Sequence, residues 1–482
     1  MKGASNIFGR QRLNRIRYDD GAQGLLILLF ISQLFLTNGI YLFLGAAVLA
    51  YVLYNLQQPL KPSVFTLIFL YHFVQVAANI WLSNYLGKDL DFRSASMEEA
   101  TICGFAGIFI LFVPIIYYQG KIPNVSLSAL RVHANKMSIE KTFKAYLIAF
   151  FVANALGGVA FVIPGLSQVI FSVINIKWFF FLLFGYQVLL KRRMMKHFVI
   201  LCSAEFLLGF ISYFSDFKTV IFFGAFLAVS FIMYVKLKHL CLAIAGLVLV
   251  SFLAVKWTAV KGEYRVFLNQ GSKSQNVSVS GSDAINKLID LGSEDIDYEK
   301  VDPVYDFLDR IQYTYHLAKT MDRIPAVLPH EYGANIGRTL EFVFTPRFLN
   351  PDKPIFKATE KTRKYTGISY AGYEQGVSFS LGYFADCYID FGYFGMFVPL
   401  LILGYIFGSA YFYFVRRSSQ NLLFNYAVVG AVFMEFTAFE ADSTYVMGRL
   451  FATLLTFLML KLFFFPWLYR QLEIPAARIK TS

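Results

Sequence analysis

The stretch HLCLAIAGLVLVSFLAVK, residues 239–256, decides the fold class of this chain. From Leu240 to Val255 it contains no charged side chain. As a helix it is roughly 27 Å long, close to the hydrocarbon thickness of a bilayer. Lipid cannot satisfy backbone hydrogen bonds, so such a run crosses a membrane as a helix. The stretch therefore predicts a membrane-spanning helix.

Similar apolar runs recur on both sides of this one. Together they predict an all-α polytopic membrane protein with about twelve transmembrane helices. The expected spans are 24–38, 39–56, 64–86, 98–118, 143–164, 167–190, 197–214, 218–235, 239–256, 391–414, 421–440 and 446–468.

Composition agrees with a membrane protein. Of the 482 residues, 57% are hydrophobic and only 16% are charged, whereas about 25% is usual in soluble domains. The net charge of +13 would suit nucleic acid, but many of the cations lie in short loops beside apolar runs. That placement indicates the positive-inside pattern and no nucleic-acid partner. Both termini are then expected in the cytoplasm.

One long polar segment interrupts the succession of spans. We divide the chain into transmembrane helices over 1–256, an extracytoplasmic loop over 257–390, and transmembrane helices with a cytoplasmic tail over 391–482. Within the loop a helix is expected to begin at Asp302, because Asp is a good N-cap and Pro303 suits the first turn. Phe307, Ile311 and Tyr315 are expected on one face of that helix.

The most informative part of the loop is PRFLNPDKP, residues 346–354, with SLGYFADCYIDFGYFGM at 380–396 further along. Arg347 and Lys353 stand among prolines that restrict the backbone. Fixed cations beside a membrane suit a diphosphate, and an arginine binds phosphate through two parallel hydrogen bonds. Each of these cations is alternatively a surface residue or part of a local ion pair.

Other cations are candidates for the same role. Lys218 follows SDF in a short outward loop, where a helix N-terminus would add free amides for phosphate; the alternative is that it only reaches the membrane interface. We expect the loop to fold over the membrane and bring Arg347 and Lys353 near Lys218. Further diphosphate-binding candidates are Arg265, Arg310, Arg338 and Arg449.

Three groups are candidates for catalysis: Asp386 at the expected start of the tenth span, Glu435 inside the eleventh, and His330 in the loop. A lone loop histidine is alternatively just solvated. Charges inside spans are costly, so Lys177 and Glu205, midway along consecutive antiparallel spans, are expected to form a structural ion pair; the alternative is that they contact substrate.

The stretch at 346–354 and the acidic, aromatic and glycine pattern at 380–396 resemble a signature of the membrane oligosaccharide repeat-unit polymerases, the O-antigen (Wzy-type) polymerases. The topology, with one large late outward loop, is similar as well. This sequence departs from the family at Lys218, where an arginine is more usual, and at Asp386, where a glutamate is more usual.

The resemblance implies a helical fold related to O-antigen ligases and a metal-independent, inverting glycosyltransferase of the GT-C type without a cofactor. Its substrates are expected to be oligosaccharides on undecaprenyl diphosphate at the outer face of the bacterial cytoplasmic membrane. A flippase and a chain-length regulator are expected partners. An O-antigen ligase and a lipid-linked oligosaccharide flippase stay open as alternatives.

Overall fold

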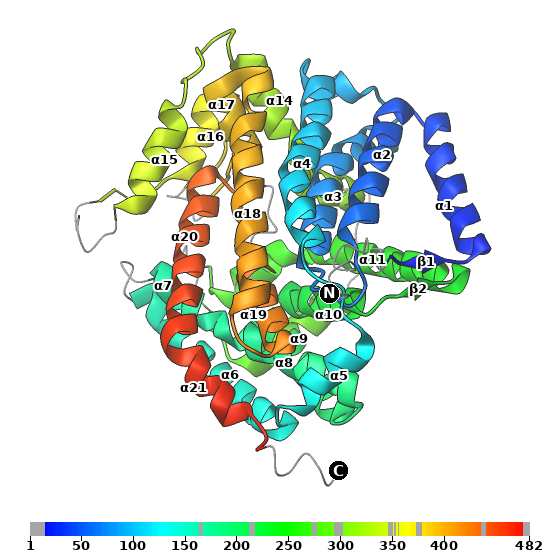
Figure 1. The fold of residues 1–482 in the computed structure, drawn as a ribbon. Coiled ribbons are helices and arrows are strands. Elements are labelled where there is room, and N and C mark those ends of the chain that lie inside the picture. The colour runs from blue at the N-terminus through cyan, green and yellow to red at the C-terminus, as the bar shows by residue number, and fades with distance from the viewer. Residues whose placement is uncertain are drawn as a thin grey trace, which may run out of the picture.

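The computed structural model describes residues 15–162, 167–211, 217–271, 277–293, 302–345, 350, 353–354, 356–372, 378–434 and 440–475. The described chain is built almost entirely from helices, as expected (Figure 1). Its one sheet among these residues is a two-residue parallel pair, β1 (Arg17–Tyr18) with β2 (Tyr234–Val235).

Among the described residues, seven helical stretches are long and apolar enough to cross a membrane. They are α2 (Gly39–Leu56), α3 (Val64–Tyr85), α4 (Met97–Gly120), residues Ile170–Lys191 of α7 (Ser167–Ile174) and α8 (Ile176–Lys191), α11 (Leu237–Leu268), α18 (Phe397–Arg417), and Ser443–Leu472, which joins α20 (Ser443–Met459), the π-helix η6 (Leu460–Phe464) and α21 (Phe465–Leu472).

Further helices occupy the other expected spans. They are α1 (Asp20–Ser32), which leads into η1 (Gln33–Phe35), α6 (Ile139–Val162), α9 (Met195–Ile211), α10 (Phe217–Ser230) and α19 (Leu422–Phe433). The 3-10 helix η2 (Leu90–Arg93) and α5 (Leu127–Asn135) lie in connections between longer helices.

The closest helix pair is α4 with α18, which run side by side in Figure 1. A Cβ atom on Gly404 would lie 2.1 Å from the carbonyl oxygen of Leu111, and one on Gly408 would lie 2.9 Å from that of Pro114. Two glycines four residues apart therefore let the two backbones touch, the usual device of tightly packed membrane helices.

The late polar segment folds into short helices, and those labelled α14 to α17 in Figure 1 lie at one end of this pair. The short helices are α12 (Gly281–Ser293), α13 (Pro303–Ile311), α14 (Thr314–Arg323), α15 (Ala334–Phe344), α16 (Ala358–Thr366) and α17 (Tyr383–Gly395). They pack on α3, α4, α11, α18 and α20, so this segment is part of one structure with the long helices.

Three sequence expectations need correction at the edges of this segment. The helix expected to end at 256 continues to Leu268. The helix that starts after Asp302 ends at Ile311, so Tyr315 belongs to the next helix. The expected span 391–414 is interrupted at Gly392, whose φ of 67° and ψ of −163° suit a residue without a side chain, and α18 begins at Phe397.

Two local expectations are confirmed. The Asp302 side chain accepts hydrogen bonds from the amides of Val304 and Tyr305, at 3.1 and 2.9 Å, with Pro303 in the first turn. Lys177 and Glu205 form an ion pair with 3.0 Å between Nζ and Oε2.

Candidate functional site

Four cations gather where α10, α11 and α13 meet, and we call Lys218, Lys261, Arg265 and Arg310 the cation cluster. Lys218 lies in the first turn of α10. Lys261 and Arg265 are four residues apart on α11 and so share one face of that helix. Arg310 lies in the last turn of α13, which packs against α11. Three of the four were expected from the sequence as phosphate ligands.

The charges of the cation cluster act on one another. Lys261 experiences the charges of Arg310, Arg265 and Lys218. The pKa of Arg310 is lowered, first because surrounding protein removes water from its guanidinium and then because Arg265 lies close by. Holding like charges together costs free energy, and a bound anion removes that cost.

Two acids, Asp306 and Glu440, stand beside this cluster, and the charge of Asp306 acts on Lys261. The charge of Glu440 acts on Arg310 and on the hydroxyls of Tyr71 and Tyr313. The Nε2 group of Gln75 donates a hydrogen bond to Oε2 of Glu440. Glu440 is therefore placed next to cations by α3 and by the turn that precedes α20.

The loop between α3 and α4 fixes α13 in this position. Tyr85 donates to the carboxylate of Asp302, the N-cap of α13, and Arg93 forms an ion pair with Asp309. The backbone amide of Tyr313 donates to the carbonyl of Gln75 at 3.1 Å. These contacts place the start of α13 at the end of α3 and Arg310 beside the middle of α3.

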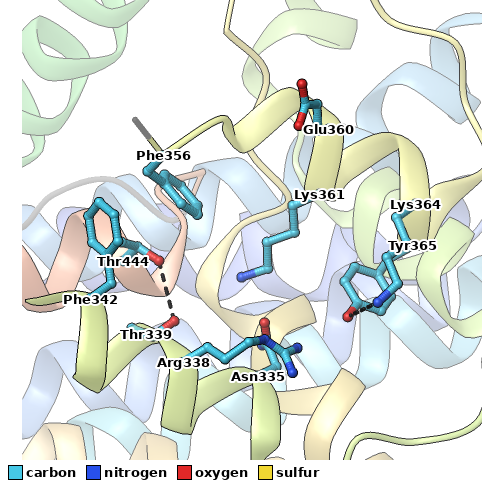
Figure 2. Close-up of a pocket in the computed structure, with 10 residues that line it drawn as sticks. All are labelled: Asn335, Arg338, Thr339, Phe342, Phe356, Glu360, Lys361, Lys364, Tyr365 and Thr444. Atoms are coloured by element: carbon cyan, nitrogen blue, oxygen red, sulfur yellow. Dashed lines mark hydrogen bonds between the residues drawn. The ribbon is translucent and has the colours of Figure 1, made fainter. Parts of the chain in front are cut away.

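A cavity of about 400 Å³ opens between α15, α16 and α20 (Figure 2). Its lining combines aromatic rings with amide, hydroxyl and charged groups: Asn335, Arg338, Thr339, Phe342, Phe356, Glu360, Lys361, Lys364, Tyr365 and Thr444. This volume suits a small-molecule ligand.

Lys361 extends toward the centre of the cavity lining (Figure 2) and bridges two buried carboxylates. Its Nζ lies 2.6 Å from Oδ1 of Asp386 and 3.0 Å from Oδ2 of Asp442. Burial alone would lower the pKa of Lys361, but the two carboxylates raise it above its usual value. The pKa of Asp442 is raised to about 6, by burial first and then by Asp386, against the opposing effect of Lys361.

Backbone amides complete this ion cluster. Oδ2 of Asp386 accepts from the amide of Ser443 at 2.9 Å, and Oδ1 of Asp442 accepts from that of Thr444 at 2.8 Å. Asp442 is thereby the N-cap of α20. Lys361, from α16, thus joins α17 to α20.

Glu331 balances the two exposed cations of the cavity. It accepts from Arg338 at 2.6 Å and Lys364 at 3.0 Å, and also from the Tyr365 hydroxyl. Burial would raise the pKa of Glu331, but the hydrogen bonds from Tyr365, Arg338 and Lys364 lower it to about 2. This carboxylate is therefore ionised at any physiological pH.

The structure gives the other predicted residues different surroundings. Arg338 lines the cavity. Lys353 donates to the carbonyls of Phe342 and Thr345, which end α15, and lies over the Phe342 ring. The Nδ1 atom of His330 lies 3.3 Å from the carbonyl oxygen of Ile389. Arg449 is exposed on α20.

Two predicted residues, Arg347 and Glu435, lie outside the described residues. The expected approach of Arg347 to Lys218 therefore stays a prediction. Asp386, expected at the start of the tenth span, lies fully buried in α17 in the ion pair with Lys361.

Sequence reasoning missed Lys361 and Lys261. Lys361 lies in TEKTRK, a polar run that indicates an exposed helix. A signal was present in the spacing of Thr359, Thr362 and Thr366, which all lie on the buried face of α16. Lys261 escaped notice because the ninth span was expected to end before it.

Metal ligation finds no support in the part of the chain that the structure describes, where no three His, Cys, Asp or Glu side chains are grouped to hold an ion.

No curated protein and no solved structure matches this chain. One family model does match, over residues 122–438, and its description is a domain of unknown function. That range contains α5 to α19, with all four residues of the cation cluster and most of the cavity. Because the match covers well over half of its length, the chain belongs to the DUF8712 family.

Proposed function

We propose that this protein is a membrane glycosyltransferase that polymerises undecaprenyl-diphosphate-linked oligosaccharide repeat units. The observation that carries the proposal is the cation cluster at the end of α11. Four cations whose charges act on one another suit the two or more negative charges of a diphosphate.

The helix that carries two of these cations supports a lipid substrate. In the most apolar part of α11, none of the residues is buried by the described protein. An apolar helix without protein cover suits contact with lipid chains. A polyprenyl tail running along α11 would place its diphosphate beside Lys261 and Arg265.

The chemistry follows from this placement. The hydroxyl of an acceptor sugar attacks the anomeric carbon, and the bond from that carbon to the diphosphate oxygen breaks. The lipid diphosphate leaves with the bonding electrons, and the cation cluster stabilises the negative charge that develops. The hydroxyl proton passes to a carboxylate that acts as general base.

We assign the base to Glu440, because it lies beside Arg310 and is partly accessible. Asp386 is fully buried and both of its carboxylate oxygens have partners, so its role is to position Lys361 and α20. Glu435 remains a second candidate base. His330 is a weaker one, since its Nδ1 atom lies against the carbonyl oxygen of Ile389.

The proposal includes the finer architecture. We expect about twelve transmembrane helices in a GT-C-like arrangement, in a bacterial cytoplasmic membrane with both termini in the cytoplasm. The cation cluster and the cavity would then face outward. A flippase would supply the lipid-linked unit, and a chain-length regulator would be a further partner.

Lengthening of lipid-linked repeat units by the purified protein tests the function. Units extracted from the host are added to protein in detergent, with a chelator and without ATP or nucleotide sugar, and products are read as a ladder on a gel. Because a detergent micelle holds no gradient, lengthening there supports an enzyme. Transbilayer movement in proteoliposomes without lengthening overturns the enzyme in favour of a flippase, and transfer only to a lipid A-core acceptor overturns it in favour of a ligase.

The matched variants are Arg310→Ala and Lys319→Ala. Loss of a cation that stabilises the leaving diphosphate should lower the rate by roughly 30- to 1000-fold. Lys319 lies in α14, is paired with Asp322 and is outside the cation cluster, so its loss should leave the rate nearly unchanged. Equal rates for both variants would show that Arg310 does not stabilise the leaving diphosphate.

A further inference from the structure

The cations that line the cavity are balanced by acids. Each of its cations has an acidic partner: Lys361 has Asp386 and Asp442, while Arg338 and Lys364 share Glu331. The lining acid Glu360 is paired with Lys357. An anion entering this cavity would have to displace a carboxylate, so an uncharged ligand is favoured over a charged one.

The walls of the cavity are aromatic. The rings of Phe342 and Phe356 lie 5.8 Å apart at an angle of 56°, and Phe356 also contacts Tyr445 at 5.6 Å. Figure 2 shows the Phe356 ring to the left of the Lys361 side chain, and both residues line the cavity. Such rings pack well against the apolar C–H face of a sugar ring.

Polar groups of several kinds face the same space. Thr339 and Thr444 are hydrogen-bonded to each other at 3.3 Å across the cavity wall, as the dashed line in Figure 2 shows. Asn335 adds an amide, and Glu360 adds an exposed carboxylate. Sugar hydroxyls both donate and accept, so this mixture of hydroxyl, amide and carboxylate groups matches them.

The cavity is close to the proposed diphosphate site along the chain. Glu440 acts on Arg310 of the cation cluster, and Asp442 binds Lys361 of the cavity. Two residues of extended chain span at most about 7 Å. The segment 440–442 therefore connects the two sites.

We propose that the cavity is a saccharide-binding site, with Phe356 as its stacking wall, that takes an uncharged sugar ring of the substrate. This inference rests on the proposed function for the identity of that substrate. On this assignment the diphosphate of the substrate binds the cation cluster, and an uncharged sugar ring of the same substrate binds the adjoining cavity.

Photo-crosslinking in the natural host tests this site without requiring turnover. Phe356 is replaced by p-benzoylphenylalanine in the full-length protein, cells are irradiated, and the purified protein is examined for carbohydrate by periodate oxidation and hydrazide labelling. The adduct is identified by mass spectrometry. The control carries the same probe at Val327, which is exposed in the same segment but does not line the cavity.

Carbohydrate on the Phe356 probe and not on the Val327 probe is the expected result. Adding Glu360→Ala should lower the adduct yield by about fivefold, the effect of one lost hydrogen bond. Lys357→Ala breaks the same Lys357–Glu360 ion pair but lies off the cavity lining, and should leave the yield unchanged.

The outcomes separate this inference from the proposed function. Normal lengthening without carbohydrate at Phe356 overturns the cavity assignment alone. Carbohydrate at Phe356 without lengthening in detergent supports the cavity assignment and overturns the polymerase. An adduct that contains only acidic sugars, or only lipid or peptide, overturns the assignment to an uncharged sugar.

Discussion

At the scale of single residues, the most consequential side chain is Lys361. It is a buried lysine between two carboxylates that are themselves almost completely buried, with exposed fractions of 12%, 0% and 1% for Lys361, Asp386 and Asp442. Taking such charges out of water is costly, and their mutual attraction offsets the cost only while all are present.

Lys361→Met should therefore destabilise the protein by about 3–5 kcal/mol, because it leaves two buried carboxylates without a cation. Lys364→Met is the matched control. That lysine is half exposed, so its loss should cost about 1 kcal/mol or less. The thermal midpoint in detergent measures both, and equal shifts for the two variants would contradict a special role for Lys361.

The raised pKa of Asp442 gives a second prediction at this scale. Its folded pKa of about 6 exceeds the unfolded value, near 3.9. Between these values the folded state holds more protons than the unfolded state, so the stability from this group falls as pH rises toward 6. Asp442→Asn keeps the N-cap and should flatten that part of the profile. Thermal midpoints of the wild type and Asp442→Asn between pH 4 and 7 measure this pH dependence. If the midpoints of the two proteins change with pH in parallel, the prediction is wrong.

At the scale of elements, α13 shows how a short helix presents a functional residue. Its N-cap, Asp302, is anchored by Tyr85, and its last turn carries Arg310. Between these ends Asp309 is paired with Arg93. Order at the start of the helix therefore determines where the guanidinium of Arg310 stands.

Asp302→Ala should loosen α13 by about 1 kcal/mol, because two backbone amides lose their acceptor. Hydrogen exchange of the amides from Val304 to Ile311 should accelerate by about fivefold. Asp302→Asn retains a capping oxygen and should exchange nearly as the wild type does. Unchanged exchange in the alanine variant would show that packing on α3 and α11 alone holds the helix.

The elements also show what the sequence could predict. The cap at Asp302 and the Lys177–Glu205 pair were predictable, because each rests on short-range chemistry or on depth in a membrane. The ends of helices were less predictable. Helix α11 continues past Lys256 to Leu268, because the more polar residues that follow the apolar run are still helical. The break in the helix at Gly392 depends on a backbone conformation that the neighbouring residues in the sequence do not specify.

The site itself was predictable only in part. Lys218, Arg265 and Arg310 were expected as cations for one ligand and do act on a common neighbour or on each other. Lys353 was expected there too, but it binds the carbonyls that end α15. Which cation contacts a helix end and which is grouped with other cations is decided by tertiary packing, so sequence alone could not distinguish them.

At the scale of the whole molecule, the two sites differ in how charge is used. The cation cluster concentrates positive charge beside an apolar helix, whereas the cavity pairs every lining cation with an acid. Both are held by the short helices of the late segment against α3, α11 and α20. The fold thus places a site suited to an anion next to one suited to a neutral ring.

This division predicts different salt dependence for the two sites. Interactions between charges are screened over roughly 10 Å at 0.1 M salt and roughly 3 Å at 1 M. Binding of farnesyl diphosphate, a short soluble probe, should therefore weaken as salt rises. Removing one cation that contacts the phosphates, as in Arg265→Ala, should weaken binding by roughly 10- to 100-fold and make the salt dependence shallower.

Glu360→Ala provides the contrast, because Glu360 lines the cavity and has no part in the cation cluster. It should leave both the affinity for farnesyl diphosphate and its salt dependence unchanged, while it lowers carbohydrate crosslinking at the cavity. Titration calorimetry of the purified protein at several salt concentrations measures the two quantities together. If Arg265→Ala and Glu360→Ala alter the salt dependence of farnesyl diphosphate binding alike, the charges of the two sites are not separate. One continuous anion-binding site then replaces the two sites proposed for this fold.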